Sequence, residues 1–148
     1  MSKSAYFTIP GPVVGKARAR TFYNSKLGRS QSITPEKTVL YENLVKSSYT
    51  QQADSRWFDK EPLRMYIKAF YPIPKSTSKK NRQLMIGGKL FPTKKPDADN
   101  VAKVICDALN GIAYGDDTQI VRLSVEKVYT DEPPRVQVLI EEVGDDTM

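Results

Sequence analysis

The hydrophobic positions of this 148-residue chain follow strand and helix periodicities in turn. Strict alternation predicts a strand over 63–71, whose shared apolar face carries Leu63, Met65, Ile67, Ala69 and Tyr71. A shorter apolar run predicts a strand over 5–9 that stops at the Pro10-Gly11-Pro12 turn. Two β-rich runs, 119–129 and 135–143, are separated by the sequence TDEPP, which predicts a hairpin or near-hairpin.

Helical spacing marks two longer segments. Thr34-Pro35-Glu36 is a typical helix start, with Thr34 as N-cap, and the helix is expected to run to about Gln52 with a core stripe of Val39, Leu40, Leu44 and Val45. A second helix is expected over 100–110, ended by Gly111. On its helical wheel one arc is apolar: Val101, Val104, Ile105, Ala108 and Leu109.

The segment 72–96 is framed by prolines and rich in lysine. Ser78 is expected to cap a short helix over 79–86 that Gly87-Gly88 ends, within a basic, flexible insertion. The order of elements predicts an α/β (α+β) fold in which a small mixed β-sheet packs with two main helices. The length fits one domain spanning 1–148, and 144–148 is expected to be a frayed tail.

Charge is distributed unevenly along the chain. Residues 1–95 hold 19 Lys and Arg against 5 Asp and Glu, whereas residues 96–148 hold 4 against 12. A basic excess of this size attracts polyanions, and nucleic acid is the obvious candidate, although a basic surface that serves only solubility is the plain alternative. In the segment 13–30, Lys16, Arg18 and Arg20 are interleaved with aromatic residues, which suits phosphate contacts and base stacking by a loop.

The chain has no histidine and a single cysteine, Cys106. These counts exclude Ser-His and Cys-His nucleophile pairs, internal disulfides and cysteine-cluster zinc sites. Catalysis must then use carboxylates, lysine or tyrosine, or a hard cation such as Mg²⁺ held by oxygen, with Mn²⁺ as a substitute. The cysteine count favours a reducing compartment, and the lack of an apolar run of about 18 residues predicts a cytoplasmic protein without a membrane span.

Acidic residues flank the second helix. Asp97 and Asp99 stand at its start, Lys103 and Asp107 follow Asp99 at successive i, i+4 positions, and Asp116-Asp117 come just before the strand at 119. Two carboxylates so close repel each other unless a cation lies between them, so Asp97 and Asp99 form a natural seat for a divalent metal. Taken singly, Asp99 is more simply a helix cap, the Asp99-Lys103-Asp107 row a set of solvated ion pairs, and Asp116-Asp117 a turn.

These motifs resemble one known family. PDADN at 96–100, Lys103, DAL at 107–109 and GDDTQI at 115–120, together with FTIPGP at 7–12, resemble the RusA Holliday-junction resolvases, phage-type endodeoxyribonucleases. The resemblance covers most of the chain, and the segment 72–96 is its departure, because it is longer and richer in lysine than expected of the family.

The resemblance implies a homodimer that binds four-way DNA junctions and makes paired, symmetric, Mg²⁺-dependent nicks in recombination and repair, in a bacterial host or phage context. By position, Asp97, Asp99 and Asp117 match the metal ligands, Asp116 is a possible ligand beside them, and Lys103 matches the essential lysine. The DNA-binding residues are expected to be Lys16, Arg18, Arg20, Lys94 and Lys95. A non-catalytic DNA-binding accessory protein, in which the aspartates only cap and pair, is the alternative.

Overall fold

A four-stranded sheet forms the centre of the fold in the computed structural model, which describes residues 3–17, 20–33 and 35–144. Its strands lie in the order β1-β6-β4-β5 and comprise β1 (Ser4–Pro10), β4 (Leu63–Pro72), β5 (Ile120–Thr130) and β6 (Arg135–Glu142). β6 is antiparallel to both β1 and β4, whereas β5 is parallel to β4. The predicted mixed α/β fold is confirmed.

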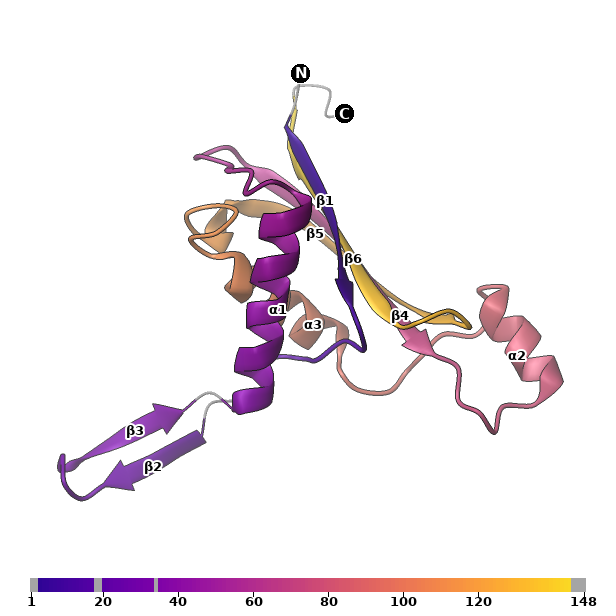
Figure 1. Ribbon diagram of the computed structural model, residues 1–148, viewed down its shortest axis with the longest axis horizontal. Coiled ribbons are helices and arrows are strands. Elements are labelled where there is room, and N and C mark those ends of the chain that lie inside the picture. The colour runs from indigo at the N-terminus through magenta and orange to yellow at the C-terminus, as the bar shows by residue number, and fades with distance from the viewer. Residues whose placement is uncertain (1–2, 18–19, 34, 145–148) are drawn as a thin grey trace.

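Helices α1 (Glu36–Gln52) and α3 (Ala98–Leu109) cover one face of this sheet (Figure 1). The alternation predicted for β4 holds, since Leu63, Met65, Ile67, Ala69 and Tyr71 are all buried beneath the helices. The apolar arc predicted for α3 is buried as well. Apolar residues thus fill the layer between the helices and the sheet, and polar residues of α3 point outward.

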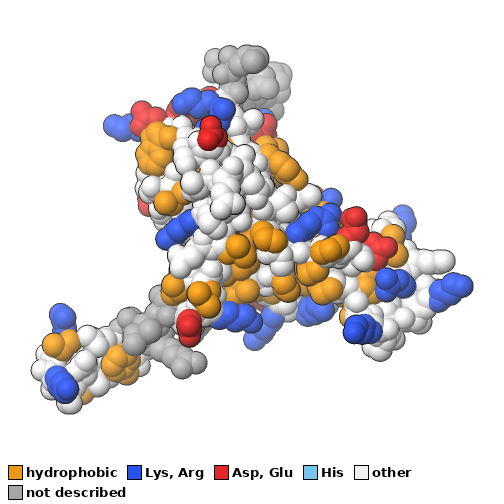
Figure 2. Space-filling view, in the orientation of Figure 1, with side chains coloured by type: hydrophobic (Ala, Val, Ile, Leu, Met, Phe, Trp, Pro, Cys, Tyr) orange, Lys and Arg blue, Asp and Glu red, His pale blue; other side chains and the backbone are white. Residues whose placement is uncertain are grey.

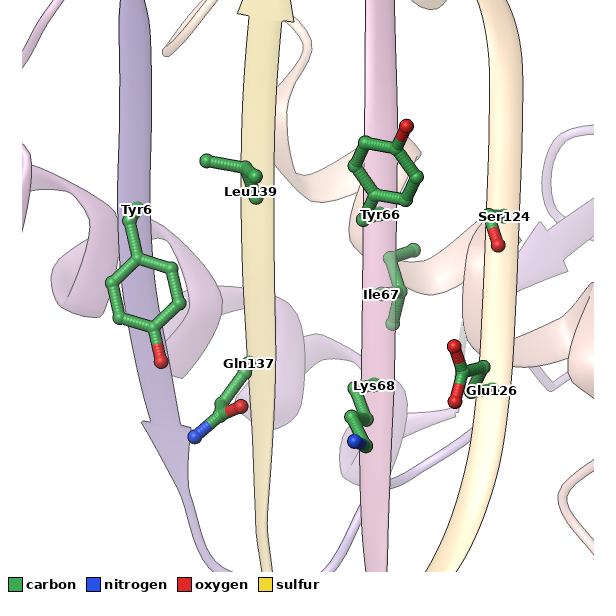
Figure 3. Close-up of a pocket in the computed structure, with 8 residues that line it drawn as sticks. All are labelled: Tyr6, Tyr66, Ile67, Lys68, Ser124, Glu126, Gln137 and Leu139. Carbon is green, nitrogen blue, oxygen red and sulfur yellow. The ribbon is translucent and has the colours of Figure 1, made fainter.

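Within the described residues, neither α1 nor α3 covers the opposite face of the sheet. Tyr6, Leu139, Tyr66 and Ser124 form one cross-strand row on it, because their strands pair in that register. Tyr6 and Tyr66 are half exposed, and the shallow hollow between these strands is lined by both (Figure 3). The hollow contains one carboxylate, Glu126, and lies across the sheet from the aspartates of α3.

The predicted hairpin between the last two strands is wrong. β5 and β6 are not neighbours, because β4 lies between them and pairs with both. The TDEPP connection therefore passes over the end of β4. A turn-rich link between two strands indicates only that the chain reverses direction, and the apolar β4 strand competes successfully for the central place.

The loop predicted over 13–30 is confirmed for residues 13–17 and is wrong from Arg20 onward. Residues Arg20–Asn24 and Arg29–Ile33 form β2 and β3, which pair with each other as a separate antiparallel hairpin. The Asn24 side chain accepts the backbone N–H groups of Lys26 and Leu27 at 3.0 and 3.3 Å, and Gly28 takes φ +65° in the turn. These turn residues, preceded by the strand-forming residues Thr21, Phe22 and Tyr23, are the sequence features that could have predicted this hairpin.

The buried face of α1 differs from the core stripe that the sequence predicted. Val39 and Leu40 are 40% and 60% exposed, and the buried residues are Thr38, Tyr41, Val45, Ser48 and Tyr49. Thr38 accepts the backbone N–H of Ala17 at 3.3 Å, and the Tyr49 ring packs edge-on against Phe7 at 5.2 Å. The helix ends at Gln52 as predicted; the N-cap position is Pro35, and Thr34 lies outside the described residues.

The short helix predicted within 72–96 is confirmed as α2 (Lys79–Ile86), whose cap Ser78 accepts the N–H of Asn81 at 3.2 Å. None of its residues is buried, and it projects from one side of the body while the β2–β3 hairpin projects from the other (Figure 1). Basic side chains follow both projections and the surface between them (Figure 2). Within the described residues, no helix has the length and apolar character needed to cross a membrane.

Candidate active site

The amino end of α3 presents two exposed aspartates. The helix begins at Ala98, two residues earlier than predicted, so Asp97 occupies the N-cap position and Asp99 lies in the first turn. Asp97 is extended, as expected after a proline, and its side chain makes no capping hydrogen bond. Its carboxylate oxygens are therefore available to a ligand, and the positive end of the helix dipole favours negative charge here.

Two residues of the sheet hold the segment that leads into α3. Tyr71 donates its hydroxyl to the carbonyl of Pro96 at 3.0 Å, and the Lys127 ammonium donates to the carbonyl of Lys94 at 2.7 Å. Lys127 also lies 5.3 Å from the centre of the Tyr71 ring, a cation–π contact. Burial, and then the nearby Asp97 carboxylate, raises the pKa of Tyr71 to about 12, so Tyr71 stays a neutral donor.

The loop 13–17, which follows β1, contacts the same end of α3. The backbone N–H of Lys16 donates to the carbonyl of Asn100 at 3.1 Å. Gly15 sits so close to the helix that an added β-carbon would lie 2.6 Å from the β-carbon of Pro96 and 3.2 Å from that of Asn100. Position 15 thus requires glycine for the close approach, and Asn100 serves as an anchor for this loop.

A groove of about 700 Å³ opens beside Asp97. Its walls come from the loop 13–17, the amino end of α1 and the segment that enters α3. Lys37 and Lys95 line it, and in the described part of the chain neither lysine forms an ion pair. The groove therefore offers positive charge next to an unpartnered carboxylate.

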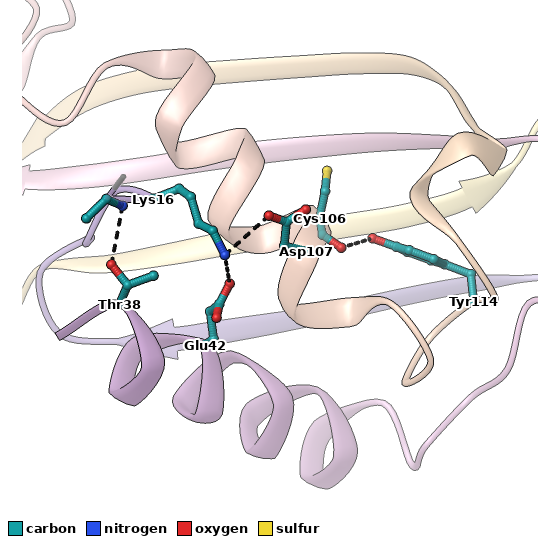
Figure 4. Close-up of polar contacts among 7 residues, drawn as sticks. Lys16, Thr38, Glu42, Cys106, Asp107 and Tyr114 are labelled. Atoms are coloured by element: carbon teal, nitrogen blue, oxygen red, sulfur yellow. Dashed lines mark hydrogen bonds and ion pairs between the residues drawn. The ribbon is translucent and has the colours of Figure 1, made fainter. Parts of the chain in front are cut away.

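Lys16 is the centre of an ion-pair cluster. Its ammonium contacts Glu42 of α1 at 2.8 Å and Asp107 of α3 at 3.3 Å (Figure 4). Burial opposes its charge, but the two carboxylates outweigh that effect and raise the pKa of Lys16. This lysine, predicted to contact DNA, thus joins the loop to both helices.

Asp116 and Asp117 lie at the turn that precedes β5. Asp116 caps a short 3-10 helix (Asp117–Gln119) and accepts the N–H of Thr118 at 3.2 Å, which lowers the pKa of Asp116. Burial, and then the Asp116 and Asp107 carboxylates, raises the pKa of Asp117. The Gln119 side chain accepts the N–H of Gly115 at 3.0 Å and donates to the carbonyls of Asp59 and Glu61. The glutamine of the GDDTQI motif therefore holds this turn.

The predicted ligands occupy two ends of α3. Asp97 and Asp99 lie at its start, while Asp117 lies near Asp107 and Asn110 at its end. The ten steps from position 97 to position 107 correspond to about 15 Å of helix. Among residues 3–17, 20–33 and 35–144, no three acidic or cysteine side chains come together as a metal-ligand group. Lys103 is exposed on the outer surface of α3, one turn after Asp99.

Of the remaining residues predicted to bind DNA, Lys95 lines the groove. Lys94 and Lys95 are exposed where the chain enters α3. Arg20 begins β2, and Arg18 lies outside the described residues. Sequence reasoning missed Gly15, Tyr71 and Lys127, which fix the entry to α3. Only their long-range contacts identify these roles, so the local sequence carried no signal for them.

The chain is similar to a protein family and to a curated bacterial protein. The model of the family described as Endodeoxyribonuclease RusA matches residues 10–141. An uncharacterised protein of Bacillus subtilis (strain 168), YqaN, is 38% identical over 140 residues, which cover 93% of this chain and 96% of that protein.

Proposed function

We propose that this chain, which belongs to the RusA endodeoxyribonuclease family, resolves four-way DNA junctions by paired, symmetric nicks that require Mg²⁺. Membership makes it a Holliday-junction-resolving endonuclease by family. The observation that carries the finer proposal is the pair Asp97 and Asp99, exposed at the amino end of α3. Lys37 and Lys95, which form no ion pair within the described residues, line the groove beside Asp97. The plain helix-cap interpretation of Asp99 loses support, because the N-cap position is Asp97 and the Asp97 side chain makes no capping hydrogen bond.

The donor set fits a hard divalent cation. Mg²⁺ is commonly held by one or two carboxylates and keeps other positions for water and substrate phosphate, and Asp97 and Asp99 supply that number of carboxylates. Such an ion supplies positive charge that lowers the pKa of a water molecule and neutralises charge on a phosphate. Mn²⁺ is an expected substitute, because it prefers the same oxygen ligands.

The lysines have separate tasks in this proposal. Lys95 and Lys37, on the walls of the groove, neutralise the backbone of the bound strand. Lys103, one turn into α3, binds an oxygen of the scissile phosphate or of the leaving group. Tyr71 and Lys127 orient the segment 94–97 and so hold Asp97 at the groove.

Asp117 remains a proposed ligand, with Asp116 as the possible alternative, but about 15 Å of helix separates it from Asp97, which is too far for both to hold the same ion within this chain. Its carboxyl group is partly buried and its pKa is raised by burial and by two neighbouring carboxylates, so a nearby cation would stabilise its ionised form. Asp97→Asn and Asp117→Asn, each titrated with Mn²⁺ in a calorimeter, separate their contributions. Loss of heat in both variants keeps Asp117 as a metal ligand, and loss of heat only in Asp97→Asn excludes it.

Two symmetric nicks require two active sites. A two-fold homodimer presents identical sites to the two-fold junction, and we propose this state for the active protein. Sedimentation at increasing protein concentration, with and without junction, tests it. A monomer in both conditions contradicts the dimer.

The decisive experiment compares wild type with Asp99→Asn on a labelled four-way junction in Mg²⁺. Wild type is expected to make symmetric nicks. Asp99→Asn is expected not to cut, because a metal ligand is lost, but still to bind the junction, because a negative charge that faces phosphate is removed. Absence of nicking by wild type, or undiminished nicking by the variant, contradicts the proposal. Flaps and other branched DNA in the same assay rank the substrates.

A further inference from the structure

The β2–β3 hairpin stands away from the body of the protein (Figure 1). Its strands pair with each other and do not join the four-stranded sheet. An isolated two-stranded hairpin is marginally stable in water, since it has no core of its own to bury apolar side chains. Here Phe22, Tyr23 and Leu27 are 41%, 67% and 51% exposed.

Phe22 and Tyr23 are consecutive residues of one strand, so they point to opposite faces of the hairpin. The cross-strand partners of these rings, Gln31 and Ser30, are polar. Each face therefore presents one aromatic ring without an apolar neighbour opposite it. A thin arm with an aromatic ring on both sides is suited to lie between two planar groups.

The charge around these rings selects the partner. Lys26 and Arg29 are exposed at the turn and at the start of β3, and the sequence from Lys16 to Pro35 contains no acidic residue. Two copies of this hairpin would repel each other, whereas a polyanion would be attracted. The root of the hairpin also leads into the loop 13–17, which lines the groove beside Asp97.

We infer that the β2–β3 hairpin is a DNA-binding arm in which Phe22 and Tyr23 stack on bases at the branch point of the substrate. Bases at a branch point can leave their stack at low cost, whereas those of a linear duplex are already stacked on their neighbours. The arm thus discriminates branched from linear DNA, while Lys26 and Arg29 contact phosphates of either. This inference rests on the proposed function for its choice of substrate.

The test measures binding of a four-way junction and of a linear duplex of equal arm length, by fluorescence polarisation in EDTA. The double variant Phe22→Ala/Tyr23→Ala, which removes two stacking rings, is expected to bind the junction at least about 30-fold more weakly, and the duplex within about twofold of wild type. Ser30→Ala, on the same hairpin, is the matched control. Circular dichroism verifies folding, which should persist because these rings lie outside the core.

A charge variant provides a second, independent readout. Lys26→Ala/Arg29→Ala is expected to weaken binding to both DNAs and to reduce the slope of log K against log salt by about 1.8, because two phosphate contacts are lost. In wild type, 2-aminopurine at the branch point should be quenched on binding, and the aromatic double variant should lose this quenching.

Equal effects of the aromatic variant on junction and duplex, or no effect on either, overturn the inference. A change in oligomeric state of that variant overturns it as well, since the hairpin would then contact a second copy. Wild-type nicking in Mg²⁺ separates this inference from the proposed function. If wild type nicks the junction and the aromatic variant keeps its preference for the junction, only the inference about the hairpin is contradicted. If wild type binds the junction selectively but does not nick it, only the proposed function is contradicted.

Discussion

Gly15 packs against Pro96 so closely that a β-carbon at position 15 would lie 2.6 Å from the β-carbon of Pro96. The contact joins two segments that are distant in sequence, the loop after β1 and the segment that enters α3. Since Asp97 follows Pro96 directly, the backbone of Gly15 helps to determine where this carboxylate lies.

Gly15→Ala is expected to destabilise the fold by about 1–3 kcal/mol, because the added methyl group forces the loop and the helix end apart. Junction nicking in Mg²⁺ should fall with it, since Asp97 moves. Chemical denaturation and the nicking assay measure the two effects. Gly115→Ala is the control for stability, because the nearest atom to its β-carbon would lie at an ordinary 3.6 Å. Equal stability of the two variants would show that the loop adjusts freely.

Lys16→Met is expected to cost about 1–3 kcal/mol of unfolding free energy, because it leaves Glu42 and Asp107 close together without their shared cation. The double variant Lys16→Met/Glu42→Gln should recover part of the loss, since one of the two carboxylates is neutralised. Chemical denaturation of the single and double variants measures the loss of unfolding free energy and its partial recovery. A change in the salt dependence of DNA binding with unchanged stability would instead assign Lys16 to a phosphate contact.

Lys95→Ala should have the opposite profile. Its side chain is exposed and lines the groove, so stability should change by less than about 0.5 kcal/mol. The slope of log K against log salt for junction binding should fall by about 0.9, the value for one phosphate contact. Lys3→Ala, at the far end of the sheet, serves as the control and should leave the slope unchanged. Identical slopes for both variants would place the DNA away from the groove.

The Cys106 thiol is expected to be unreactive in the folded protein. Burial, and then the Asp117 and Asp107 carboxylates, raises the pKa of Cys106 to about 12, so the thiol stays protonated at pH 8. Because the folded-state pKa is raised, the stabilisation is complete below the unfolded value, 9.0, and is lost as pH rises toward 12. Ellman's reagent at pH 8 should label the denatured chain quickly and the native chain slowly. Fast labelling of the native protein would mean that α3 detaches from the sheet.

Local sequence patterns were sufficient to predict three elements and the buried faces of two of them. The alternation in 63–71 predicted β4 and its buried face, the apolar arc in 101–109 predicted the core side of α3, and Ser78 with Gly87-Gly88 predicted α2. The motifs around PDADN and GDDTQI were sufficient to indicate the family. In each case the information lies within a few residues, where backbone geometry and side-chain periodicity decide the structure.

Long-range packing determined the strand order, the buried face of α1 and the position of Asp117. β4 lies between β5 and β6 because pairing across a sheet depends on long-range competition, which a turn sequence does not encode. The face of α1 that is buried depends on the approach of β1 and α3, and tyrosines with small polar residues occupy it in place of Val39 and Leu40. The separation of Asp117 from Asp97 likewise depends on where the turn before β5 meets α3, because carboxylates far apart in sequence meet only through packing.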